Sequence, residues 1–76
     1  MRDRIRELMA GLWGVPLELI PPDATTETLE GWESLRHLEL MLELELTFGV
    51  RIAVDEVAEL RSIDAIEDAL GAHGVV

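Results

Sequence analysis

Ser34 is the side chain of this 76-residue sequence whose surroundings most suggest chemistry. It follows an acidic residue, Glu33, and opens a stretch of leucines and glutamates that reads SLRHLELMLELELTF. A serine nucleophile needs a base within hydrogen-bond reach. The chain has two histidines, His37 one helical turn further on and His73 near the C-terminus, and no oxyanion-hole motif accompanies either. We therefore expect no catalytic residue, and Ser34 needs another explanation.

Two explanations of Ser34 remain open from the residues alone. A serine at the start of a helix commonly caps it, because its oxygen accepts a hydrogen bond from an otherwise unpaired backbone N–H group. The same position favours an attached phosphate, because the helix dipole and the free N–H groups point toward it. Ser34 is therefore interpreted as a structural cap, an attachment point, or both.

The composition and the spacing of residues give little support for a metal site. The chain contains no cysteine, which excludes disulfide bonds and thiolate metal ligands. The segment DATTETLEGWES, residues 23–34, lacks the alternating ligands and the sixth-position glycine of a calcium loop. The sequence contains neither a zinc constellation nor a glycine-rich nucleotide loop. We predict no metal site.

Acidic charge dominates the chain, which has 16 acidic residues, 6 basic ones and a net charge of −10. All the basic residues are arginines, and clusters of lysine and arginine are what bind nucleic-acid phosphates, so we expect no nucleic-acid ligand. The charge fits docking on basic surfaces of partner proteins. No stretch resembles a signal peptide or approaches the roughly 18 apolar residues of a membrane span, so we expect a cytoplasmic protein.

Apolar periodicity predicts one all-α domain over residues 1–76, a small four-helix bundle with three main helices and a short third one. The first helix covers residues 5–13 and ends before Gly14. A long loop over residues 15–32 follows it, with one helical turn near its start. A loop of this length needs apolar anchors, and the candidates are Leu17, Ile20 and Leu29.

The second half of the chain holds the other three helices. The second helix is predicted over residues 34–48 and stops at Gly49, whose lack of a side chain suits a C-terminal cap. Residues 50–54, VRIAV, alternate like a strand, but the sequence offers no partner strand, so we interpret them as a connector. Asp55 is expected to cap the short third helix, and Ser62 to cap the fourth.

The helix over residues 34–48 carries two apolar faces when its residues are placed about 100° apart. One has the width of a core-facing stripe and holds Leu40, Met41, Leu44 and Phe48, with His37 among them. The other lies between Glu39 and Glu45 and holds Leu35, Leu38, Leu42 and Leu46. Either this helix packs on both sides, or part of the second face is an exposed docking patch, with Leu35 more covered than the other leucines.

The segment LEGWESLRHLELMLELELTFGVRI, residues 29–52, resembles the signature region of acyl carrier and peptidyl carrier proteins. Their pattern is a glycine, any residue, then Asp-Ser-Leu at the start of the second helix, followed by an apolar and acidic helix. The matching residues are Gly31, Ser34, Leu35, the acidic Glu45 and the core anchors Phe48 and Ile52. The order of helices, the long first loop and the acidity agree as well, so the resemblance covers nearly the whole chain.

The resemblance implies a carrier protein that is not itself an enzyme. Ser34 would receive 4′-phosphopantetheine from coenzyme A through a separate phosphopantetheinyl transferase, and the thiol of this arm would hold an acyl or aminoacyl group as a thioester. The carrier is expected to be a monomer. Its further partners would be a loading ligase or transferase and downstream biosynthetic enzymes. The implied docking residues are Glu33, Leu35, Leu38, Glu39, Leu42, Glu45 and Leu46.

Three residues qualify this interpretation. Glu33 replaces the usual Asp, and its longer side chain is expected to cap less well. Leu46 stands where many fatty-acid carriers have an acidic residue. The tryptophan just before the motif, Trp32, makes the sequence resemble discrete carriers of specialised pathways. The cargo stays open between fatty acyl, polyketide, short hydroxyacyl and aminoacyl groups. The alternative function is that of a small acidic helical adaptor for protein interactions, in which Ser34 is only a cap.

Overall fold

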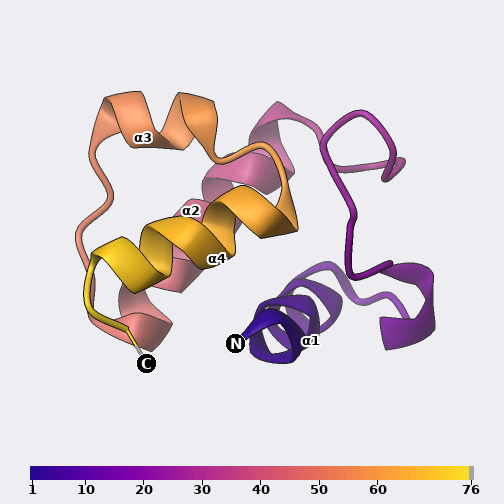
Figure 1. Cartoon of the computed structure of the whole chain (residues 1–76). Coiled ribbons are helices and arrows are strands. Elements are labelled where there is room, and N and C mark those ends of the chain that lie inside the picture. Colours follow the sequence, from indigo (N-terminus) through magenta and orange to yellow (C-terminus); the bar gives the residue numbers. More distant parts are fainter. Residues whose placement is uncertain (76) are drawn as a thin grey trace.

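The computed structural model describes residues 1–75, which contain four α-helices (Figure 1). They are α1 (Arg2–Trp13), α2 (Ser34–Phe48), α3 (Val54–Glu59) and α4 (Ile63–Ala72), and a short 3₁₀ helix (Leu17–Leu19) lies in the loop after α1. This order confirms the predicted all-α bundle with a long first loop and a short third helix. Among the described residues, no helix combines the length and apolarity needed to cross a membrane.

Helices α1 and α2 each end at a glycine in the left-handed conformation. Gly14 has φ 67° and Gly49 has φ 66°, values that a residue with a Cβ rarely adopts. The N–H of Gly49 donates to the carbonyl of Glu45 at 2.9 Å, which satisfies one of the last carbonyls of α2. Both ends lie where the sequence predicts them, because glycine is the local signal for such an end.

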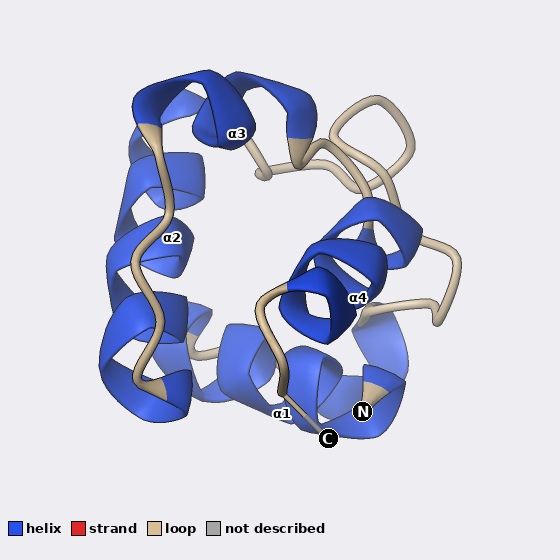
Figure 2. Ribbon diagram, turned by 60° about the vertical axis from the view of Figure 1, so that its left-hand side comes forward, coloured by secondary structure: helices blue, strands red, loops and turns tan. Residues whose placement is uncertain are grey.

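The core forms where α1 packs against α2 and α4, while α3 lies on the side of the molecule opposite α1 (Figure 2). Each large apolar side chain that is fully buried stabilises the fold by about 1.5–3 kcal/mol. The loop after α1 contributes three buried residues, and α3 itself contributes none. The buried residues are Ile5, Met9, Ile20, Ala24, Trp32, Leu40, Met41, Leu44, Leu60, Ile63, Ile66 and Leu70.

The long loop is anchored to α1 by both apolar and polar contacts. Of the three predicted anchors, Ile20 is fully buried, whereas Leu17 and Leu29 are half-buried. The guanidinium of Arg6 donates to the carbonyl of Ile20 at 2.7 Å and to that of Leu17 at 3.3 Å. The carbonyl of Leu17 also accepts from the N–H of Ile20 within the 3₁₀ helix, so the bonds from Arg6 fix both this turn and the path of the loop close to α1.

A second set of backbone contacts joins the loop to the start of α4. The N–H of Thr26 donates to the carbonyl of Arg61 at 2.9 Å, and the N–H of Ile63 donates to the carbonyl of Ala24 at 3.0 Å. This short antiparallel pairing holds the loop beside the segment that connects α3 with α4. The middle of the long loop and the residues just after α3 are thereby brought together.

The predicted caps of the last two helices had different outcomes. Ser62 caps α4, since its hydroxyl accepts a hydrogen bond from the N–H of Ala65 at 3.0 Å, as predicted. The prediction that Asp55 caps α3 is wrong, because α3 starts one residue earlier and Asp55 lies within its first turn. The side chain of Glu56 instead accepts from the N–H of Ala53, the residue before the helix, at 3.0 Å.

Candidate functional site

Ser34 is the first residue of α2, and its side chain is exposed. The residue before it caps the helix, because a carboxylate oxygen of Glu33 accepts a hydrogen bond from the N–H of Arg36 at 3.1 Å. The interpretation of Ser34 as the cap is therefore wrong, and the longer side chain of Glu33 does reach the N–H group. Within residues 1–75, the hydroxyl of Ser34 makes no hydrogen bond. It is therefore free to take part in attachment chemistry.

Gly31 sets the turn that leads into α2. Its φ of 92° is in the region that favours glycine, and a Cβ at this position would lie 3.1 Å from Nη1 of Arg36. That close approach lets the guanidinium of Arg36 lie over the ring of Trp13, 5.6 Å from its centroid. The glycine of the signature region thus has a structural role three residues before Ser34.

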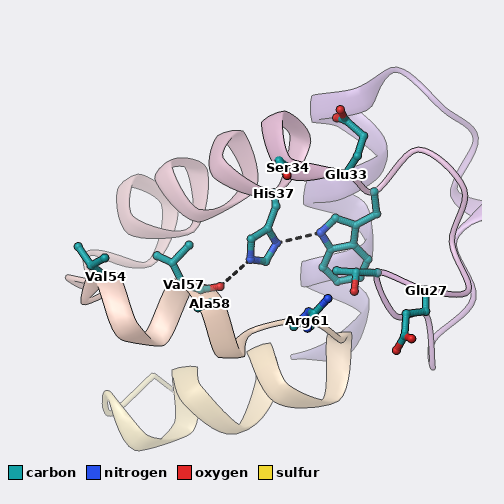
Figure 3. A pocket seen from close by; sticks show the side chains of 10 residues that line it. Glu27, Glu33, Ser34, His37, Val54, Val57, Ala58 and Arg61 are labelled. Carbon is teal, nitrogen blue, oxygen red and sulfur yellow. Dashed lines mark hydrogen bonds between the residues drawn. The ribbon is translucent and has the colours of Figure 1, made fainter.

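His37 links α2 to α3 through Nε2 and to the loop before α2 through Nδ1 (Figure 3). The indole N–H of Trp32 donates to Nδ1 at 3.0 Å, and Nε2 lies 2.7 Å from the carbonyl oxygen of Val57. An indole N–H can only donate and a carbonyl can only accept, so Nδ1 accepts and Nε2 donates. His37 is half-buried, in keeping with its predicted place in the core-facing stripe, and neither nitrogen is left to serve Ser34 as a base.

The burial of Trp32 is the part of this arrangement that the sequence did not reveal. Its side chain is only 3% exposed and its ring lies 6.0 Å from that of His37, measured between centroids. The sequence pattern placed Trp32 at the end of a loop, where no periodicity indicates which side chains turn inward. A tryptophan two residues before a helix was the one available signal.

A pocket of about 430 Å³ opens beside Ser34, between the loop before α2 and helix α3 (Figure 3). Trp32 and Val57 contribute apolar surface to its lining, and Glu27 and Arg61 contribute charges of opposite sign. The pocket exists because the pairing between the loop and the start of α4 brings these segments together. Its volume lies within the range of small-molecule sites, about 300–1,000 Å³.

The second apolar face of α2 is exposed along its whole length. Its side chains are exposed to 64% at Leu35, 54% at Leu38, 62% at Leu42 and 79% at Leu46. The opposite stripe is buried at Leu40, Met41 and Leu44 and half-buried at Phe48. The helix therefore packs on one side only, and the expectation that Leu35 is more covered than the other leucines is wrong. We call Leu35, Leu38, Leu42 and Leu46 the docking face.

The acidic residues beside the docking face differ in their exposure and in whether they already make a hydrogen bond. Glu33 and Glu39 are exposed, whereas Glu45 is half-buried. A carboxylate oxygen of Glu45 accepts a hydrogen bond from the N–H of Ile52 at 2.7 Å, which fastens the connector between α2 and α3. Val54, which the sequence predicts as part of the connector, lies at the start of α3, is 88% exposed and lines the pocket.

Polar contacts also hold the far side of α3. The carboxylate of Glu56 accepts from the N–H of Ala53 at 3.0 Å and lies 2.9 Å from Nε2 of His73, beyond the end of α4. The hydrogen bond from Ala53 and, after it, the interaction with His73 lower the pKa of Glu56 below its ordinary value. Helix α3 is thus tied to α2 on one side and to the end of α4 on the other.

The start of α2 fits a covalently attached phosphate-linked group. The Ser34 oxygen is exposed, it lies at the helix end where the dipole favours negative charge, and it borders a pocket that contains the cationic side chain of Arg61. A metal centre is not formed by the described part of the chain, where no group of three or more suitable side chains comes together. The site is suited to carrying a group on an oxygen atom.

Comparison with known proteins agrees with this geometry. The family model described as "Phosphopantetheine attachment site" matches residues 3–70. The chain is 37% identical to "Acyl carrier protein 2" of Pseudomonas aeruginosa over 71 residues, which cover 88% of this chain and 90% of the relative. It is 33% identical to an acyl carrier protein of Syntrophobacter fumaroxidans over 70 residues, covering 92% of this chain and 86% of the relative.

A third relative is the acyl carrier protein of Syntrophus aciditrophicus, 31% identical over 75 residues that cover 99% of this chain and 94% of the relative. The match to the family model and these relatives together span almost the entire fold, including all four helices. The chain belongs to the family of phosphopantetheine-attachment carrier proteins. Members of this family are generally carriers and not catalysts.

Proposed function

We propose that this chain is a carrier protein whose Ser34 oxygen bears a 4′-phosphopantetheine arm, and that residues 1–76 form a single carrier domain. The observation that carries the proposal is the exposed hydroxyl of Ser34, placed at the first turn of α2 and beside a pocket. Membership of a phosphopantetheine-attachment family supports the nature of the group. The position of Ser34 supports this serine as the point of attachment.

The arm supplies the thiol that a chain without cysteine lacks, and this thiol holds an acyl or aminoacyl group as a thioester. During attachment, the Ser34 oxygen forms a bond to the phosphorus of the pantetheine phosphate, and the adenosine bisphosphate part of coenzyme A leaves. The base that takes the serine proton belongs to a phosphopantetheinyl transferase, because both ring nitrogens of His37 are already hydrogen-bonded. The start of α2 then stabilises the negative charge of the phosphodiester.

The docking face is the surface we propose for contact with the transferase, with loading enzymes and with downstream enzymes. Exposed leucines in a row are unusual on a surface that meets only water, and apolar patches beside charged residues commonly serve as protein contacts. Glu33 and Glu39 add negative charge that favours basic partners and fast association. Glu45 contributes less, because its carboxylate already holds the connector.

Incubation with coenzyme A and a broad-range phosphopantetheinyl transferase, followed by measurement of the intact mass, tests the proposal. The wild-type protein is expected to gain the mass of one phosphopantetheine group, and Ser34→Ala is expected to gain none. Ser62→Ala is the matched control, since Ser62 is the other serine of the chain and also lies at a helix start. It is expected to gain the same mass as the wild type. Equal masses for wild type and Ser34→Ala would contradict the proposal.

An adaptor without an arm is the second candidate function, and the exposed docking face is the observation that favours it. Such a protein would gain no mass under the same conditions, yet changes in the docking face would still weaken binding to its partner. The mass measurement therefore separates the two candidates before any partner is known.

A further inference from the structure

Two arginines lie near Ser34, and they face different sides of the start of α2. Arg36, two residues further along the helix, lies over the ring of Trp13, 5.6 Å from its centroid, and lines a separate pocket on that side. Arg61, in the segment between α3 and α4, lines the same pocket as Ser34 (Figure 3). As far as residues 1–75 form it, the lining of this pocket contains no other lysine or arginine. Arg61 therefore places a cation on the pocket side of Ser34.

The guanidinium of Arg61 is free, although the backbone that carries it is fixed. The N–H of Thr26 donates to the carbonyl of Arg61 at 2.9 Å, and the N–H of Arg61 donates to the carbonyl of Glu59 at 2.9 Å. The side chain of Arg61 is exposed and takes part in none of the ion pairs formed within residues 1–75. The five N–H donors of a guanidinium are thus available to an acceptor at a defined place beside the pocket.

The charges around Ser34 indicate the nature of that acceptor. The carboxylate of Glu33, directly before Ser34, is held at the helix start by the N–H of Arg36. Glu27 also lines the pocket, and within the described chain it forms no ion pair with Arg61. A phosphodiester on Ser34 adds a further negative charge near these carboxylates, which repel it. A guanidinium compensates such a charge well, because it pairs with phosphate oxygens through two parallel hydrogen bonds.

We propose that Arg61 binds the phosphodiester of the arm and directs the first part of the arm across the pocket, toward the segment between α3 and α4. This inference rests on the proposed attachment at Ser34. The phosphate is the anion in question because it is bonded to the Ser34 oxygen at the edge of the pocket, whereas a carboxylate in the cargo lies at the far end of a flexible arm. An exposed ion pair is weak and is screened by salt, so a partner that binds the docking face can release the arm.

The wild-type protein alone gives the first test. Its arginine side-chain signals are compared by ¹⁵N NMR before and after attachment, at low salt and slightly acidic pH, once the mass has shown that the arm is present. Attachment is expected to shift the Nε–H signal of Arg61 and to slow its exchange with water. The Nε–H signal of Arg51, which is exposed and lines a different pocket, is expected to stay unchanged. A shift at Arg36 in place of Arg61 would overturn the inference.

Two variants of equal charge give the second test. Arg61→Gln and Arg51→Gln each remove one positive charge, and of these two arginines Arg61 is the one that lines the pocket at Ser34. The midpoint of thermal unfolding is measured before and after attachment. Attachment is expected to lower the midpoint of Arg61→Gln by about 1–4 °C more than the midpoints of wild type and Arg51→Gln. In about 0.5 M sodium chloride the three changes are expected to agree, because salt screens exposed charges.

The cargo distinguishes the phosphate from a carboxylate as the anion that Arg61 binds. The transferase attaches the bare arm, an acetyl-bearing arm or a succinyl-bearing arm from the corresponding form of coenzyme A. The shift of the Arg61 Nε–H signal is expected to be the same for all three, because all three contain the phosphodiester. A shift that occurs only with the succinyl group would assign Arg61 to a cargo carboxylate and would overturn the assignment to the phosphate.

The failure of this inference differs from the failure of the proposed function. An unchanged Arg61 signal in a protein that carries the arm would overturn the inference and leave the attachment at Ser34 intact. Equal changes in the midpoints of Arg61→Gln and Arg51→Gln at low salt would do the same. The wild-type measurement decides the question even where a variant accepts the arm poorly. A wild-type protein that gains no mass would contradict the proposed function itself, and this inference with it.

Discussion

Helices α3 and α4 follow one another in the chain, yet different forces hold them in place. Three residues of α4, namely Ile63, Ile66 and Leu70, are buried in the core, and the hydroxyl of Ser62 caps its start. Every residue of α3 keeps some exposure, and polar contacts fix its position. These contacts are the hydrogen bond from His37 to the carbonyl of Val57 and the hydrogen bonds of the Glu56 carboxylate.

Because polar contacts hold α3, the helix that can move most easily lies beside the candidate attachment site. Apolar burial is lost only when the core opens, whereas a single hydrogen bond contributes about 0.5–1.5 kcal/mol and can break locally. Helix α3 forms one wall of the pocket at Ser34, through Val54 and Val57. Helix α4 and the buried stripe of α2 form the stable base against which that wall is positioned.

The largest effect is expected from shortening a buried side chain of α4. Ile66→Ala removes part of a fully buried side chain and is expected to lower the free energy of unfolding by about 2–5 kcal/mol. Its counterpart in α3 is Val57→Ala, which shortens a half-buried side chain and keeps the carbonyl, with an expected cost of about 1 kcal/mol. Urea denaturation measures both. An equal loss in the free energy of unfolding for both variants would contradict the claim that apolar burial holds α4 more strongly than α3.

The cap of α4 is expected to contribute the next largest amount. Ser62→Ala removes the acceptor for the N–H of Ala65 and is expected to cost about 1 kcal/mol of stability. Ser34→Ala is the matched change at the start of α2, and it is expected to cost clearly less, because Glu33 caps that helix. The same denaturation experiment compares them, and a larger cost for Ser34→Ala would show that Ser34 has a capping role after all.

A smaller, pH-dependent effect is expected from Glu56. Its pKa is lowered in the folded protein, so the ionised carboxylate stabilises α3 above the ordinary pKa of 4.5, and this contribution is lost as the pH falls through the lowered pKa. Glu56→Gln is expected to remove this acid-dependent part. Amide hydrogen exchange of α3, followed from neutral pH to below 4.5, measures it. An identical acid dependence in wild type and variant would contradict the assignment.

The smallest effect on stability is expected at the docking face. Leu46→Ser replaces the most exposed leucine of that face and should change the free energy of unfolding by less than about 0.5 kcal/mol. Under the proposed function it should nevertheless slow the modification of Ser34 by a transferase that binds this face. The initial rate of mass gain measures this, with Thr47→Ala as an exposed control on the same helix. Equal rates for wild type and Leu46→Ser would argue against contact at Leu46.

Local signals in the sequence were sufficient for most of the fold. Gly14 and Gly49 end α1 and α2 where glycine was expected, and Ser62 caps α4. The two apolar faces of α2 follow from helical spacing alone. The stripe that holds Leu40, Met41 and Leu44 is buried as predicted, but helical spacing does not decide whether the second face is covered as well, because that depends on how the other helices lie around α2.

The parts of the site that the sequence did not reveal depend on contacts between distant residues. Val57 lies 20 positions from His37, and nothing in the local pattern indicates that its carbonyl meets the imidazole. The shift of the α2 cap to Glu33 depends on a side-chain conformation, and so does the role of Glu56 at the start of α3. Propensity alone favours Ser34 and Asp55 at these positions.

The central claim is that Ser34 carries the arm, and fragment-ion mass spectrometry of the protein after treatment with coenzyme A and a transferase tests it most directly. The fragments are expected to place one phosphopantetheine group on Ser34 and to leave the fragment that contains Ser62 unchanged. An added group on any other residue, or no added group on the fragment that contains Ser34, would contradict the claim.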